Sequence, residues 1–267
     1  MLSIAREILR FRGLLLTLVG RELKARYRGS VLGFFWSLVN PTLLAAVYSF
    51  VFGFVFVPRQ AAGTDPYALF LITGLFPWIW LSTSLLEGAL SLVANAGLIR
   101  KAVFPAALLP IVAVFSNLVH FLLALPVLAV ALVVGRALGH PVGGWSALLL
   151  PLVIVLELPL VGGLALGLAA LNVHFKDVKD ILTNLLTLLF FMTPVIYPLA
   201  AVTFRPLWWV VRLNPFTPFT LAYQQLLFFH VVPDATLWLQ MAIGAALGWV
   251  IGASLFARLS DTLVEAV

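Results

Sequence analysis

Long runs of apolar residues, each close to the length that crosses a bilayer, limit most strongly what this chain can fold into. Six such runs occupy residues 31–57, 67–93, 107–134, 145–171, 181–197 and 237–257. A transmembrane α-helix needs about 20 mostly apolar residues. Hydrophobic residues make up 63% of the 267 residues and charged residues 10%, which is more apolar surface than a soluble domain of this size can bury. We therefore expect an all-α integral membrane protein with six transmembrane helices in one domain.

The positions of the basic residues set the orientation expected for these six helices. Twelve of the 16 Arg and Lys residues fall on one side of the predicted spans and four on the other. Cytoplasmic loops carry the excess of Lys and Arg in membrane proteins. We therefore expect the basic side, with both termini, to lie in the cytoplasm. The net charge of +6 then reflects topology and contact with lipid head groups rather than binding of nucleic acid.

The residue types and motifs that the sequence lacks exclude several kinds of chemistry. There is no cysteine, which excludes disulfides, thiolate metal sites and cysteine catalysis. There is also no G-x-x-x-x-G-K-[ST] phosphate loop, no H-E-x-x-H and no G-x-S-x-G motif. We therefore expect no catalytic residue, no metal site and no cofactor in this chain. The basic first 30 residues lack a small-residue cleavage site, so no cleavable signal peptide is expected.

Residues 1–30 combine apolar residues at helical spacing with seven Arg and Lys residues. Such a helix lies along the membrane surface with its basic side toward phosphates. Two interpretations remain open from the sequence. The helix either anchors the chain and sets its topology, or it contacts a cytoplasmic partner. For the second case the candidate contact residues are Arg21, Lys24, Arg26 and Arg28.

Two short amphipathic segments, 94–105 and 172–180, connect predicted spans on the cytoplasmic side. Each is either a simple turn or a short surface helix that docks on a soluble subunit. Residues 198–236 are different, because five prolines interrupt an apolar, aromatic-rich stretch. Broken backbone at membrane depth survives only where protein or a water-filled cavity covers it. We therefore expect short re-entrant or interfacial helices there rather than a seventh span.

Two carboxylates, Glu87 and Glu157, lie within predicted spans. Ionisable groups at membrane depth are costly and are candidates for function. A proton-coupled carrier would pair them with a basic residue, but His120 is the one imidazole within a span and no Lys or Arg lies inside one. For each carboxylate we favour a hydrogen bond between helices, with Asn117 or His120 as candidate partners.

Four aromatic residues, Trp36, Trp78, Trp80 and Tyr197, are candidates for lining a path through the membrane. Aromatic side chains near span ends also form interfacial belts and pack against lipid. The alternative is a channel in which aromatic faces pack against the C–H groups of sugar rings. Trp36 begins the first span, where a belt is expected, and for the other three both interpretations stay open.

Several segments, taken in order, resemble the permease subunit of type-2 ATP-binding-cassette exporters, in the branch that exports polysaccharides. The opening R-E-L-K-A-R-Y-R-G-S-V-L-G-F-F-W-S-L-V-N-P at 21–41 is similar to that of the family. So are the segment 95–110, with its L-I-R-K and F-P motifs, and T-P-V-I-Y-P at 193–198. At 176–177 this chain has Lys-Asp where the family often has Arg-Asp, which keeps the charge pair. The resemblance covers nearly the whole chain.

This resemblance implies a homodimer in a bacterial inner membrane, paired with two cytoplasmic ATPase subunits that bind ATP and Mg and carry out hydrolysis. The substrate class implied is O-antigen, capsular polysaccharide or teichoic acid, often attached to a lipid carrier. Residues 198–236 would form gate helices on the outer side. The residues that would contact the ATPase are Asn95, Leu98, Ile99, Arg100, Lys101, Phe104, Lys176 and Asp177.

Two alternatives to polysaccharide export stay open from the sequence. A permease of another type-2 branch would export a drug or a lipid. An ion- or proton-coupled carrier would use Glu87 or Glu157, although no inverted repeat is evident in the sequence.

Overall fold

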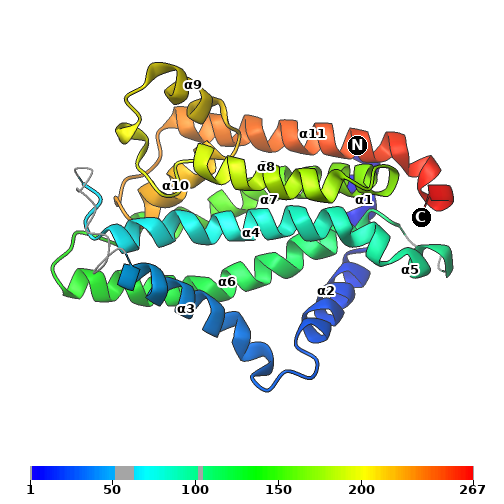
Figure 1. Cartoon of the computed structure of the whole chain (residues 1–267), viewed down its shortest axis with the longest axis horizontal. Helices are drawn as coiled ribbons and strands as arrows, with labels where there is room; N and C mark the ends of the chain where they lie inside the picture. The colour runs from blue at the N-terminus through cyan, green and yellow to red at the C-terminus, as the bar shows by residue number, and fades with distance from the viewer. Residues whose placement is uncertain (1, 52–62, 102–104, 267) are drawn as a thin grey trace.

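The computed structural model describes residues 2–51, 63–101 and 105–266 (Figure 1). All regular secondary structure in these residues is helical, which confirms the all-α prediction. The α-helices are α1 Leu2–Arg10, α2 Arg12–Arg26, α3 Trp36–Phe50, α4 Tyr67–Ala94, α5 Ala96–Lys101, α6 Leu108–Ala137, α7 Leu150–His174, α8 Val178–Met192, α9 Arg205–Leu213, α10 Thr217–Leu227 and α11 Ala235–Ala266. The 3₁₀ turns are η1 Gly33–Phe35, η3 Trp145–Leu149 and η4 Leu199–Ala201.

Four helices within the described residues are long and apolar enough to cross a membrane. They are Tyr67–Ala94, Leu108–Ala137, Trp145–His174 and Ala235–Ser260. These four correspond to the second, third, fourth and sixth predicted spans. The chain is therefore a multi-pass membrane protein by helix length and composition.

The first and fifth predicted spans differ from the expected bounds. The span expected at 31–57 begins as a helix at Trp36, and its last residues, 52–57, lie outside the described part of the chain. Residues before Trp36 form a reversal instead, with Gly29 and Gly33 at φ angles of +78° and +50°. The span expected at 181–197 is α8, which ends at Met192 because Pro194 cannot continue it.

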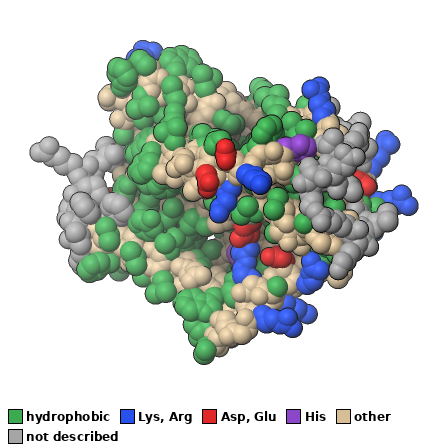
Figure 2. Space-filling model, turned by 45° about the vertical axis from the view of Figure 1, so that its right-hand side comes forward, with side chains coloured by type: hydrophobic (Ala, Val, Ile, Leu, Met, Phe, Trp, Pro, Cys, Tyr) green, Lys and Arg blue, Asp and Glu red, His purple; other side chains and the backbone are tan. Residues whose placement is uncertain are grey.

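The long helices pack side by side in a bundle in which α4 is central, with α4, α7 and α11 running in one direction and α6 and α8 in the other (Figure 1). Helix α4 contacts α6, α7, α8 and α10, and most of its residues are buried. Helices α1 and α5 and both chain ends lie at one end of this bundle. Lys and Arg side chains gather around that end on the face drawn in Figure 2, whereas hydrophobic side chains dominate the opposite end.

Helices α7 and α11 approach each other at four glycines, where no side chain separates their backbones. Gly163 and Gly167 of α7 face Gly248 and Gly252 of α11. A Cβ atom on Gly167 would lie 3.1 Å from the Cα atom of Gly252. One on Gly252 would overlap the carbonyl of Gly163. The backbones of the two helices are therefore in direct contact.

Residues 198–236 fold into η4, α9 and α10 before the chain enters α11. Nine of the 11 residues of α10 are buried. The helix packs against α4, α7, α9 and α11, so protein covers this break in the helical backbone. At the other end of the chain, the single amphipathic helix expected over residues 1–30 is broken at Phe11 into α1 and α2.

Candidate functional site

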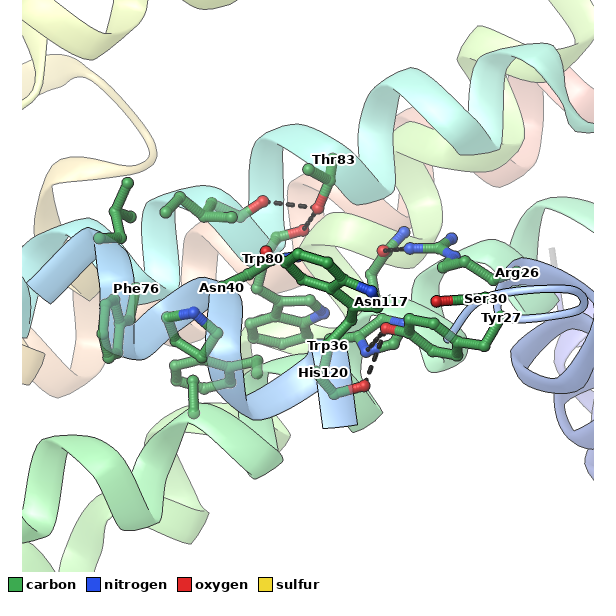
Figure 3. Close-up of a pocket in the computed structure, with 16 residues that line it drawn as sticks. Arg26, Tyr27, Ser30, Trp36, Asn40, Phe76, Trp80, Thr83, Asn117 and His120 are labelled. Carbon is green, nitrogen blue, oxygen red and sulfur yellow. Dashed lines mark hydrogen bonds between the residues drawn. The ribbon is translucent and has the colours of Figure 1, made fainter. Parts of the chain in front are cut away.

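A cleft of about 570 Å³ separates the end of α2 and the start of α3 from α4 and α6 (Figure 3). Aromatic rings line much of it, and side chains that donate or accept hydrogen bonds line the rest. The lining residues are Arg26, Tyr27, Ser30, Trp36, Ser37, Asn40, Pro41, Leu44, Phe76, Ile79, Trp80, Thr83, Asn117, His120, Phe121 and Ala124. The cleft therefore joins the reversal between α2 and α3 to the centre of the bundle.

The aromatic part of the cleft is held by a stacked pair of rings. Trp80 of α4 and Phe121 of α6 lie parallel, with ring centroids 5.3 Å apart and an interplanar angle of 3°. The indole Nε1 of Trp80 donates to the carbonyl of Val114 at 3.4 Å, which fixes the ring orientation. Trp36 of α3 lies across the cleft from α4 (Figure 3). Two of the four predicted aromatic candidates, Trp36 and Trp80, thus line one cleft.

The polar end of the cleft is bordered by hydrogen bonds that join its lining residues to Glu87, which lies just outside it. Arg26 forms an ion pair with Glu87, with 2.6 Å between Nη2 and Oε2. Asn117 donates to the same carboxylate oxygen at 2.7 Å and accepts from Arg26 at 3.2 Å. Ser37 donates to the hydroxyl of Tyr27 at 2.8 Å. The Glu87–Asn117 bond is one of the partnerships that the sequence predicts.

The second membrane carboxylate has a partner that sequence reasoning missed. Glu157 is 2% exposed and accepts a hydrogen bond from the hydroxyl of Tyr223 at 2.7 Å. Asn117 and His120, the predicted candidates, bond elsewhere. Tyr223 lies on α10, in the proline-interrupted stretch 198–236, and no local sequence signal connects it with α7.

The remaining aromatic candidates lie away from the cleft. The ring of Trp78 packs against Phe190 of α8 at 5.8 Å and against Phe216 at 6.2 Å. The hydroxyl of Tyr197 donates to the carbonyl of Phe191 at 2.8 Å. Trp78 is buried, so its ring contributes to the packing of α4 against its neighbours.

The first predicted ATPase-contact segment forms the end of α4 and the short helix α5. Asn95 follows α4, and its side-chain amide donates to the carbonyl of Ser91 at 2.9 Å. Leu98 and Ile99 of α5 pack partly against the apolar cluster that includes α1, α2 and α6. Arg100 and Lys101 belong to α5, but only their backbone is described. Phe104 lies outside the described residues.

The other predicted contact residues lie in the turn after α7 and on or just after α2. Lys176 and Asp177 are exposed in the turn between α7 and α8. Arg21, Lys24 and Arg28 are exposed on or just after α2, whereas Arg26 points to Glu87. The described residues contain no group of three metal-ligating side chains. The cleft offers hydrogen bonds and aromatic faces, which suit the binding of a ligand.

The apolar helices define a multi-pass membrane protein, and the lined cleft lies between α2 and α3 on one side and α4 and α6 on the other. The family model for the ABC-2 type transporter matches residues 13–228. The O-antigen export system permease protein RfbA of Myxococcus xanthus is 41% identical over the full length of both chains. A Klebsiella pneumoniae protein of the same name is 32% identical, covering 80% of this chain and 79% of its own. The chain belongs to the ABC-2 type transporter family.

Proposed function

We propose that this chain is the membrane subunit of an ATP-driven exporter that moves a polysaccharide, lipid-linked or free, across a bacterial inner membrane. The observation that carries the proposal is the full-length match, at 41% identity, to a protein named as an O-antigen export permease. Permease subunits of this family are not themselves enzymes and work with an ATPase partner. ATP and Mg would therefore be bound by two separate cytoplasmic subunits.

In this proposal α3 and α8 are the first and fifth of six membrane spans. Each has 15 helical residues, and a helix of that length is about 22 Å long. The hydrocarbon core is ~30 Å thick, so flanking residues would complete each crossing. Helices α9 and α10 would be re-entrant gate helices on the outer side. The end with α1, α5 and both termini would face the cytoplasm, in agreement with its basic side chains.

We infer that a second copy covers the polar faces of α4 and α8. Ser82 and Thr83 form part of a partly exposed stripe along α4. On α8, Thr183, Asn184 and Thr187 are exposed, although each also bonds to its own helix backbone. Polar side chains in membrane helices face the protein interior or a water-filled cavity rather than lipid. A homodimer would enclose these faces and the cleft in one path.

The lining of the cleft suits a sugar polymer. Pyranose rings present C–H groups to aromatic faces and hydroxyl groups to amides and alcohols. Trp36 and Trp80 offer aromatic rings, and Asn40 and Thr83 offer neutral polar groups beside them. These groups would let successive sugar units bind weakly and move on.

The test is export by the complex of this chain with the ATPase encoded beside it, in proteoliposomes. The complex is expected to hydrolyse ATP and to move the polysaccharide, and the chain alone is expected to do neither. Arg100→Glu with Lys101→Glu should abolish ATP-driven export if α5 contacts the ATPase. The proposal fails if no complex forms and the double variant still exports. Movement of a drug or lipid instead would support the other branch, and dependence on a proton gradient would support a carrier.

A further inference from the structure

The connection between α2 and α3 is a reversal of the chain whose glycines have no packed neighbours (Figure 1). Gly29 and Gly33 adopt left-handed φ angles, and no atom lies within 4 Å of the position of a Cβ at either residue. Val31 is fully exposed and Phe35 is 70% exposed. This connection can therefore bend without disturbing a packed core. Its two glycines supply backbone conformations that other residues rarely adopt.

The residue that ends α2, in contrast, is bound to two other helices. The guanidinium of Arg26 donates to Glu87 of α4 at 2.6 Å and to Asn117 of α6 at 3.2 Å. Asn117 donates in turn to Glu87 at 2.7 Å. The three side chains therefore form a closed triangle. A planar guanidinium presents two donors at a fixed angle, which suits a bridge between a carboxylate and an amide.

The next residue extends this attachment to the start of α3. The hydroxyl of Tyr27 accepts from Ser37 at 2.8 Å and lies 3.3 Å from Nδ1 of His120. The Tyr27 and His120 rings also meet edge to face, with centroids 5.7 Å apart. Consecutive residues, Arg26 and Tyr27, thus attach the end of α2 to α4, α6 and α3 beside the cleft.

Helix α2 is otherwise held by apolar packing. Leu15, Leu18 and Val19 are buried in a cluster with Leu108 and Val112 of α6. That packing fixes α2 on α6, and Arg26 extends the attachment to α4, which carries Trp80 and the polar stripe. A displacement of α2 would therefore reach the cleft wall on α4 through the carboxylate of Glu87.

We propose that Arg26 is a positioning residue that transmits displacement of α2 to α4 through Glu87, while the Gly29–Gly33 reversal lets α3 pivot about its Tyr27–Ser37 contact instead of moving with α4. The spacing of α3 and α4, and with it the width of the cleft, then changes when α2 moves. This inference rests on the proposed function, because a cytoplasmic ATPase would supply the displacement. Without the Arg26–Glu87 pair, ATP hydrolysis would continue but less of it would result in transport.

The test measures ATP hydrolysis and polysaccharide export in the same proteoliposomes that contain the intact complex. Arg26→Glu and Glu87→Arg each place like charges together, and Glu87→Gln removes the charge at constant size. All three should leave ATP hydrolysis near the wild-type rate and lower export per ATP by about tenfold, a typical size for coupling between sites. The exchange variant, Arg26→Glu with Glu87→Arg, restores the ion pair and should recover most of the export. Arg258→Glu, the same charge change at an exposed position of α11, should have no effect.

A second measurement follows the cleft directly. The chain has no cysteine, so Asn40→Cys gives one thiol in the cleft. In the wild-type background its reaction with a water-soluble maleimide should change when ATP is added, and in Arg26→Glu it should not. The inference is overturned if the exchange variant still exports less polysaccharide per ATP than the wild type. It is also overturned if the single variants reduce the amount of assembled complex but leave export per ATP unchanged. If wild-type complex hydrolyses ATP but exports no polysaccharide, the proposed function fails instead.

Discussion

The carboxylate of Glu157 on α7 and the hydroxyl of Tyr223 on α10 form a hydrogen bond of 2.7 Å between two fully buried side chains. This bond attaches α10 to the long helices. The ring of Tyr223 also meets Phe121 edge to face at 5.9 Å, and Phe121 stacks on Trp80 of the cleft. The short helix that breaks the regular bundle is thus in contact with the aromatic wall of the cleft.

Tyr223→Phe tests the contribution of this bond to stability. The change leaves the Glu157 carboxyl buried without its donor, which is expected to lower the free energy of unfolding by about 1–3 kcal/mol. Unfolding of the detergent-solubilised protein measures the loss. Replacing both partners, as in Glu157→Met with Tyr223→Phe, should cost less than the single change, because no unpaired polar group remains. Equal stability of Tyr223→Phe and wild type would contradict the prediction.

Gly252→Ala tests the backbone contact between α7 and α11. The added methyl group would overlap the carbonyl of Gly163, so the helices must separate. We expect a loss of about 1–3 kcal/mol in unfolding free energy, as for other overpacked cores. Gly20→Ala is the matched control on α2, because its Cβ would have no neighbour within 4 Å. A similar loss in both variants would point to an effect of helix glycines in general.

Trp36→Ala tests the role of the cleft in export. Trp36 is partly exposed, so its loss should affect export more than folding. An aromatic contact contributes about 0.5–1.5 kcal/mol, which predicts a reduction of about two- to tenfold in the export rate. Trp36→Phe keeps an aromatic face and should retain most of the rate. Trp145→Ala, at a 69% exposed position of η3 outside the cleft, is the control. An equal effect of all three changes would refute a stacking role for Trp36.

Asn184→Cys tests whether a second copy covers α8. In a chain without native cysteine, the new thiol should react with a short bis-maleimide in membranes and give a cross-linked dimer. Ile243→Cys, on an outward-facing and apolar position of α11, should stay monomeric under the same conditions. Gel electrophoresis separates the two products. Cross-linking through α11 but not through α8 would place the dimer interface elsewhere.

Helix type and the four longest apolar helices could be predicted from the sequence because hydropathy and length directly report burial in a bilayer. The bounds of α3 and α8 could not, because they depend on local backbone conformation. The glycines before Trp36 and the turn at Pro194 shorten both helices relative to their apolar runs. An apolar run in the sequence shows how many residues can lie in the membrane, but it does not show at which residue the helix begins or ends.

The candidate site could be predicted in part. The bond between Glu87 and Asn117 was within reach of sequence reasoning, because a membrane carboxylate needs a partner and polar residues in the spans are few. Arg26 was expected to face lipid phosphates or a soluble partner. Its contact with Glu87 depends on how α2 packs on α6, which no local pattern encodes. The same holds for Tyr223, which is 66 residues from Glu157.

The glycine contact between α7 and α11 has a mechanical consequence. Side chains between helices can change rotamer and absorb small shifts, but two backbones in direct contact at these glycines cannot slide or tilt there without losing van der Waals contact. The α7–α11 pair therefore forms a stiff frame. A transport cycle must then place its motion in the helices attached to that frame by fewer contacts. Among the described residues, α3 packs mainly on α4 and α6 rather than on α7 or α11, so it can move relative to the frame.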